Sequence, residues 1–276
     1  MKATNRSSLS IREFTLVQTA IVLMVAALFT GGALVAEELS KMYAIHEQVS
    51  QIAAFDQAVA NFNSKYEGLP GDLLHVSAIR MGLPTGNGTP AHGDGDGNIS
   101  PCTLGWQPHL GCETALFWLH LSAAGMIKGN FSEDGRLSDD RLEEIQEMDS
   151  YLPESPLEAG VYITVWNTNE SQPSPEPRLP YGNYYEISGI DGISNGQMVD
   201  NPQALTPEQS YAIDAKMDDG KPFSGRVMVN GAADWPNDAW GTYAKPGGFN
   251  CVFTDKTYNT AYLATHTQLC HLAVRL

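Results

Sequence analysis

The segment most suited to chemistry alternates polar side chains with glycine, in the run Asp94-Gly95-Asp96-Gly97-Asn98. Oxygen ligands at alternate positions suit calcium, and the glycines let the backbone bend around an ion. The two aspartates and the asparagine are therefore the predicted calcium ligands, with the remaining ligands expected from elsewhere in the fold. The alternative is an acidic surface turn, because Ile99 and Gly105 stand where a loop of the EF-hand type has its glycine and its closing glutamate.

Two further acidic segments are weaker candidates for a cation. Residues 130–137 have a similar composition, but Arg141 occupies the closing position, and Asp218-Asp219-Gly220 is most simply a turn. The sequence contains no HExxH, no phosphate-binding loop and no dinucleotide-binding glycine pattern. We therefore expect that the protein is not an enzyme.

The cysteines form two close pairs in the sequence, Cys102 with Cys112 and Cys251 with Cys270. Four cysteines allow three pairings, and no CxxC arrangement favours zinc or redox chemistry. An even number of cysteines beyond a hydrophobic segment is typical of an oxidising compartment. We expect the two local disulfides, each of which closes a short loop.

These polar groups follow an apolar segment, Phe14 to Ala36, whose 23 uncharged residues exceed the roughly 20 needed to cross a bilayer. Basic residues precede the segment and acidic residues follow it, at Lys2, Arg6, Arg12, Glu37 and Glu38. This asymmetry predicts a cytoplasmic N-terminus and an exported remainder. A cleaved secretory signal is the alternative, with Gly31-Gly32-Ala33 as the cleavage site, but the segment is longer than the core of such a signal.

The helix is expected to continue beyond the membrane. No glycine or proline occurs between Glu37 and Tyr66, and apolar residues recur at mostly helical spacing, at Ile45, Val49, Ile52, Val59, Phe62 and Tyr66, with Phe55 beside them. Gly68-Leu69-Pro70-Gly71 should end the helix. The predicted organisation is therefore a basic leader over 1–13, a long helix over 14–66 and a globular domain over 67–276.

The globular domain is predicted to combine helices with a small antiparallel sheet and large loop insertions, an α+β fold. Strands are expected over 160–166, 184–188, 226–230 and 268–275, and helices over 113–128, 139–148 and 207–217, the last with Thr206 as its N-cap. The net charge of −16 at pH 7 argues against nucleic acid and anionic lipid as partners of this domain, and leaves cations.

Several motifs lie at consistent places along the chain. Phe14-Thr15-Leu16-Val17 begins the apolar segment, Glu13 precedes it and Gln18 follows. Later motifs are Tyr66-Glu67-Gly68-Leu69-Pro70-Gly71-Asp72, the glycine and aspartate run at 94–99, Trp118 with His120-Leu121, and Ile213 to Gly220. Together they resemble the type IV pilin and pseudopilin superfamily, in which cleavage after a glycine frees a mature chain that begins Phe-Thr-Leu-(Ile/Val)-Glu.

The resemblance implies a structural subunit, a minor component of a type IV pilus, a type II secretion system or a related filament. Its expected partners are other pilin-like subunits, contacted through the N-terminal helix, and a prepilin peptidase that cuts between Glu13 and Phe14. The implied location is the bacterial inner membrane, crossed once, with the globular domain in the periplasm or in an extracellular filament. The alternative is a membrane-anchored, exported binding module that does not polymerise.

Two positions depart from the family pattern. Glu13 stands where the family has Gly, and Gln18 stands where it has a Glu whose carboxylate neutralises the N-terminal amine of a neighbouring subunit. One interpretation is that cleavage occurs and the subunit sits at a filament tip, where no neighbour needs the carboxylate. The other is that Glu13 blocks the peptidase, so that no amine is freed.

Overall fold

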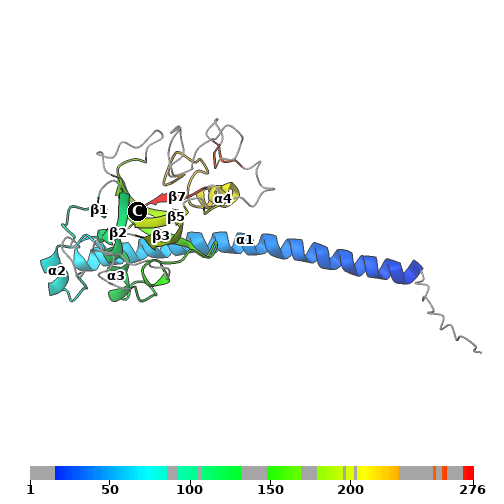
Figure 1. Cartoon of the computed structure of the whole chain (residues 1–276), viewed down its shortest axis with the longest axis horizontal. Helices are drawn as coiled ribbons and strands as arrows, with labels where there is room; N and C mark the ends of the chain where they lie inside the picture. Colours follow the sequence, from blue (N-terminus) through cyan, green and yellow to red (C-terminus); the bar gives the residue numbers. More distant parts are fainter. Residues whose placement is uncertain are drawn as a thin grey trace, which may run out of the picture. The chain divides into compact units, whose positions relative to one another are not determined.

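The computed structural model describes residues 16–85, 93–104, 107–131, 148–168, 179–194, 197–201, 204–229, 251–252, 257–259 and 270–276. For residues 16, 101–104, 107–111, 191, 193–194 and 197–201 it describes the backbone only. The chain divides into two compact units, Met1–Tyr43 and Ala44–Leu276, and the boundary between them falls within helix α1 (Leu16–Tyr66). The expected long helix is thus confirmed over its described length (Figure 1).

In the first unit, α1 carries large apolar side chains that nothing in the described part of this unit covers. Those with the largest exposed fractions are Val17, Leu23, Met24, Leu28, Phe29 and Leu34. Within the described residues, α1 is the one helix long and apolar enough to cross a membrane. After the apolar segment, Lys41 forms ion pairs with Glu37 and Glu38 at 2.9 and 3.4 Å. These features are compatible with a single-pass anchor.

In the second unit, α1 becomes amphipathic, because one face of the helix contributes to the protein core. The predicted stripe is buried at Ile45, Ile52, Phe55, Val59, Phe62 and Tyr66, and Val49 is partly buried. The helix ends at Tyr66, and Glu67 follows with a φ of 58°. The helix therefore ends just before Gly68-Leu69-Pro70-Gly71, the segment that was predicted to end it.

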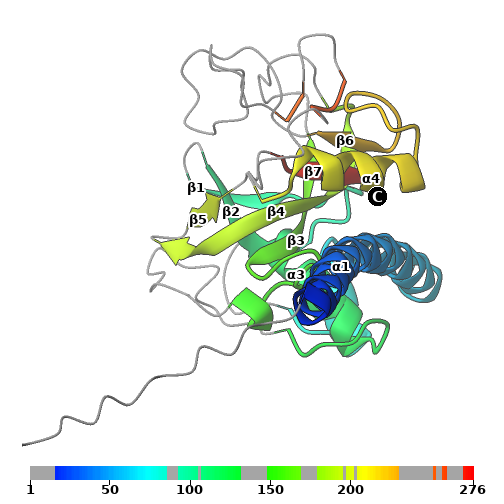
Figure 2. The same cartoon turned by 90° about the vertical axis from the view of Figure 1, so that its right-hand side faces the viewer.

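The second unit contains a five-stranded antiparallel sheet. Its strands are β3 (Val161–Thr168), β4 (Gly182–Ser194), β5 (Gln197–Asn201), β6 (Val227–Val229) and β7 (Leu272–Arg275). The order is β3-β4-β7-β6, and β5 pairs with the second half of β4. A separate hairpin joins β1 (Pro101–Leu104) to β2 (Gln107–Cys112). Figure 2 shows β4 as the long strand beside β3. The predicted α+β class is confirmed, with four of the strands near their predicted positions.

The shorter helices agree with the predictions in part. They are α2 (His75–Arg80), α3 (Glu113–Ala123), the 3-10 turn η2 (Met148–Ser150) and α4 (Pro207–Met217). Thr206 caps α4 as predicted, since its hydroxyl accepts from the backbone N–H of Gln209, whose side chain accepts from Thr206 in return. The prediction that α3 extends to Lys128 was wrong, because the chain turns at Gly125, with a φ of 69°. Of the helix expected over 139–148, the structure describes Met148 alone.

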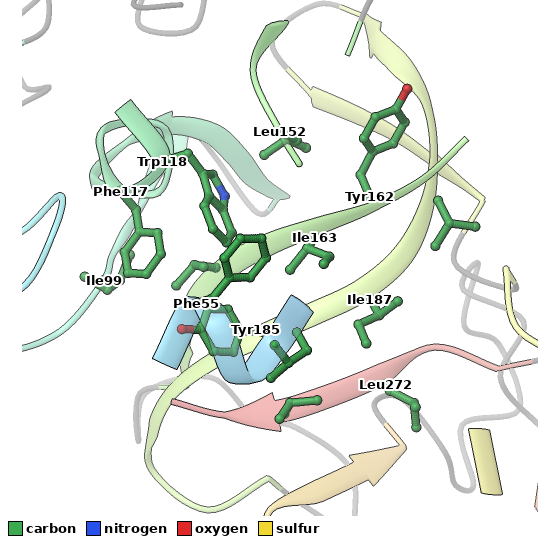
Figure 3. Close-up of a cluster of buried hydrophobic side chains, with 14 of the residues drawn as sticks. Phe55, Ile99, Phe117, Trp118, Leu152, Tyr162, Ile163, Tyr185, Ile187 and Leu272 are labelled. Atoms are coloured by element: carbon green, nitrogen blue, oxygen red, sulfur yellow. The ribbon is translucent and has the colours of Figure 1, made fainter. Parts of the chain in front are cut away.

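Aromatic rings join α1, α3 and the sheet in the core. Phe55 of α1 meets Trp118 of α3 with ring centroids 4.8 Å apart, and both lie near Tyr185 of β4, at 6.1 and 6.2 Å. Figure 3 shows these rings together with Ile163 and Leu272, which come from β3 and β7. The core therefore lies where α1 and α3 pack against the sheet.

Polar contacts also tie α1 to the rest of the second unit. Nη2 of Arg226 donates to both carboxylate oxygens of Asp56 at 2.7 Å, which links α1 to the residue just before β6. Near the start of the unit, the fully buried Gln48 accepts from the hydroxyl of Ser155. Since these contacts are specific in direction, they fix the register of α1 against the sheet more sharply than apolar packing alone.

Candidate functional site

The candidate site begins at Asp72, which ends the Leu-Pro-Gly-Asp motif after α1. Its side chain is almost fully buried, at 3% exposure. Oδ1 accepts the backbone N–H of Gly95, and Oδ2 accepts that of Gly97, both at 2.8 Å. The run at 94–98 is therefore folded around a carboxylate that lies 22 or more residues earlier in the chain.

A second buried carboxylate, Glu113, holds the same run from its other side. Glu113 is the first residue of α3 and is 4% exposed. One of its oxygens accepts the backbone N–H of Asp94 at 3.2 Å, and the other accepts that of Ser100 at 2.6 Å. The 94–100 segment is thus attached by its backbone to two carboxylates from different elements.

Close backbone packing explains the glycines of the loop. Gly93 lies against the backbone of Asp72 and Leu73, so that a Cβ at this position would overlap main-chain atoms. Gly95 and Gly97 have φ values of 75° and 86°, a region that side chains with a Cβ rarely adopt. The glycines that suggested a loop around an ion therefore also allow the backbone to fold closely around the carboxylate of Asp72.

Three carboxylates meet at this loop. One oxygen each of Asp72, Asp94 and Asp96 lies within 4.8 Å of the others, close enough to hold one metal ion. Asp94 and Asp96 are exposed, and each also accepts a backbone N–H two residues later in the chain. The sequence identified Asp94 and Asp96 as candidate ligands, and the structure adds Asp72, which had been assigned no role.

The third predicted ligand, Asn98, has its side-chain oxygen engaged elsewhere, while its Nδ2 donates to Asp96 at 2.9 Å. Its Oδ1 accepts from the hydroxyl of Tyr181 at 2.6 Å and from the amide of Asn167 at 3.0 Å. Asn183 of β4 adds two contacts, accepting from the N–H of Ile99 and donating to the carbonyl of Gly97. This network attaches the loop to β3 and β4, and the metal-sized cluster consists of the three aspartates.

Burial and mutual repulsion disfavour the ionised forms of the carboxylates at this site. Burial raises the pKa of Asp72, assisted by the charges of Asp96 and Asp94 and opposed by the hydrogen bonds from Gly97 and Gly95. Burial likewise raises the pKa of Glu113 to about 8, although the N–H groups of Ser100 and Asp94 act in the opposite direction. A cation among these carboxylates would stabilise their ionised forms and lower both pKa values.

A second acidic cluster lies at the C-terminal end of α4, where one oxygen each of Asp214, Asp218 and Asp219 lies within 4.8 Å of the others. The fully buried Asp214 accepts from the hydroxyl of Tyr258 at 2.8 Å and from the N–H of Gly220 at 3.0 Å. Burial raises the pKa of Asp214 to about 6. Asp218 and Asp219 accept from nearby groups as well, so this cluster has the contacts expected of the predicted turn.

The remaining predicted residues are placed as follows. A disulfide joins Cys251 and Cys270, whose Cα atoms are 5.2 Å apart. Cys112 is also disulfide-bonded, and the side chain of Cys102 lies outside the described part. Gln18 is exposed on α1. Glu13, Phe14 and most of the 130–137 segment lie outside the described residues.

No protein-family model, no curated protein and no solved structure matches this chain. The long apolar helix and the small antiparallel sheet are compatible with a pilin-like fold.

Proposed function

We propose that this chain is a structural, pilin-like subunit, a minor component of a type IV pilus, a type II secretion system or a related filament, anchored in the bacterial inner membrane. The observation that carries the proposal is helix α1, a single helix of 51 residues. Its N-terminal half exposes apolar side chains, and its C-terminal half is part of the core of the second unit. A helix of this kind joins an exported domain to a lipid bilayer or to the helices of neighbouring subunits.

Exposed apolar side chains on α1 account for the proposed partners. Leu28 and Phe29 are 71% and 76% exposed, which is unfavourable in water and favourable in lipid. Helices of other pilin-like subunits would cover the same side chains by close packing. The proposed role is therefore assembly through α1, without catalysis.

A non-polymerising, membrane-anchored binding module is the second candidate. Gln18 favours it, because an uncharged side chain cannot neutralise an ammonium in apolar surroundings, where a bare charge costs several kcal/mol. Glu13 favours it too, if it prevents cleavage. The two candidates differ in what α1 touches: protein in a filament, lipid alone in an isolated anchor.

Photo-crosslinking through α1 tests the proposal. A photoreactive phenylalanine analogue at Leu28 should yield covalent adducts with other pilin-like subunits in native membranes, and intact-mass analysis should define the N-terminus. The matched control places the analogue at Gln57, an exposed position of α1 in the second unit. Adducts with lipid only would support the isolated anchor. Recovery of the chain as the bulk component of purified filaments would contradict both candidates.

We further propose that the ion at the Asp72, Asp94 and Asp96 cluster is calcium. Carboxylate oxygens are hard ligands, and calcium accepts six to eight oxygens in flexible geometry, so water and backbone oxygens can complete a site of three carboxylates. The location on an exported domain is consistent with this, because calcium sites of exported modules function at high calcium concentrations.

Calcium should raise the melting temperature of the full-length protein in detergent, measured after treatment with EDTA. Asp96→Ala should abolish the increase, whereas Asp219→Ala in the second cluster should preserve it. The increase should be larger at pH 8 than at pH 6. Burial raises the pKa of Glu113 to about 8, so at pH 6 its carboxyl group is largely protonated, and calcium must displace that proton before it can interact with the carboxylate. An equal increase with magnesium would contradict the assignment to calcium. No increase with calcium would contradict cation binding and support the alternative, an acidic surface turn.

A further inference from the structure

His120 of α3 bridges two parts of the chain that are distant in sequence. Its side chain is 1% exposed. Nδ1 accepts the backbone N–H of Gly71 at 2.9 Å, and Nε2 lies 2.9 Å from the carbonyl oxygen of Pro84. Because a backbone N–H can only donate and a carbonyl can only accept, these partners require an imidazole with its proton on Nε2 and none on Nδ1.

The surroundings of the ring do not suit a charge. The ring of Phe62 stacks on the imidazole, with centroids 5.9 Å apart and planes 7° from parallel. Around its contacts, the titratable and charged side chains are Lys65, Tyr66 and Glu67 at the end of α1, Asp72, His75 and Arg80 of the following segment, and Glu113 of α3. Burial nevertheless dominates the pKa of His120 and lowers it to about 4, opposed by the hydrogen bond to Pro84.

The two partners of His120 are the ends of one segment, Gly71 to Pro84, which contains α2. The segment inserts the buried side chains Leu73, Ala78 and Leu83 into the core and exposes Leu74, Val76 and Ile79, each more than half accessible. A proton on Nδ1 would remove the acceptor of the Gly71 N–H and place two donors face to face. One protonation event thus weakens the attachment at Gly71 and buries a cation beside the attachment at Pro84.

We propose that His120 is a proton-sensitive latch, which holds the Gly71–Pro84 segment against α3 when it is neutral and releases the segment on acidification while the sheet stays folded. This conformational device does not rest on the proposed role in a filament. Its consequence is that acid exposes the apolar residues of the segment before the rest of the second unit unfolds.

Hydrogen–deuterium exchange of the full-length protein in detergent tests the latch. Rates are compared at pH 7.5 and pH 5, corrected for the intrinsic effect of pH, with excess EDTA in both samples to remove cations. If the released imidazole has its ordinary pKa, the opening equilibrium of peptides covering 71–84 should rise about 30-fold. Peptides from β3 and β4 should keep their protection, and unchanged protection of 71–84 would overturn the proposal.

Two variants separate His120 from the histidine that lies within the segment. His120→Gln keeps one acceptor and one donor but does not titrate, so it should lose the pH response of the segment. His75→Gln removes the histidine of α2 and should retain the response. A normal response in His120→Gln would overturn the proposal, and so would loss of the response in His75→Gln, which still tests the proposal if the first variant does not fold.

Discussion

Replacing Phe55 with alanine should lower the free energy of unfolding of the second unit by about 3–5 kcal/mol, the usual range for truncating a buried phenylalanine. Phe55 is 7% exposed and contacts Trp118 and Tyr185, so its removal leaves a cavity where α1, α3 and β4 meet. The aromatic neighbours cannot collapse into that space without moving the helices. Urea unfolding of the full-length protein in detergent, followed by near-UV circular dichroism, would measure the loss.

Gln57→Ala is the matched control for Phe55. Gln57 lies two residues later on the same helix, is exposed, and makes one side-chain hydrogen bond, to Asn61 within α1. Its replacement should change the free energy of unfolding by less than about 0.5 kcal/mol. Equal effects of the two substitutions would contradict a core in which the second half of α1 takes part.

Loss of the Cys251–Cys270 disulfide should lower the free energy of unfolding by about 3 kcal/mol. The two cysteines are 19 residues apart, and the chain-entropy model gives roughly this value for a loop of that size. Cys270 lies two residues before β7 and also exchanges two backbone hydrogen bonds with Leu205, at 2.9 Å each. The crosslink therefore restrains a segment that leads directly into the sheet.

The double variant Cys251→Ala/Cys270→Ala, which leaves the disulfide of Cys112 intact, isolates this effect. The measurement is urea unfolding under non-reducing conditions, with Lys221→Ala as a surface control. Lys221 contacts Asp219 at 3.6 Å and is largely exposed, so its loss should cost less than about 1 kcal/mol. A double variant as stable as the wild type would show that the crosslink restrains nothing in the unfolded chain.

Sequence periodicity predicted the elements whose stability is local or whose burial repeats regularly. The stripe on α1 from Ile45 to Tyr66 and the N-cap Thr206 are examples, because both are encoded within a few residues. Strand β4 extends to Ser194, beyond the predicted end at Ser188. Gly189 and Gly192 resemble strand breakers in the sequence, yet pairing with β5 keeps this stretch extended.

The site around Asp72 could be predicted only in part, since its main contacts join distant residues. The spacing of Asp94 and Asp96 is visible in the sequence, whereas the contact of Asp72 with Gly95 spans 23 residues and that of Asn183 with Gly97 spans 86. Alternation of polar residues also cannot reveal where the amide of Asn98 points. The available signal is the Leu-Pro-Gly-Asp motif that contains Asp72, but by itself this motif indicates the end of a helix and a family resemblance, and it predicts no ligand.

The position of β7 constrains when the sheet can close during synthesis. This strand, Leu272–Arg275, lies between β4 and β6, so residues near the end of the sequence complete the middle of the sheet. Until these residues are synthesised, β6 has no neighbouring strand, and the edge of β4 from Tyr184 to Ile187 is unpaired. A chain synthesised only as far as β6 therefore cannot close its sheet, and its exposed strand edges leave it prone to aggregation until β7 is added.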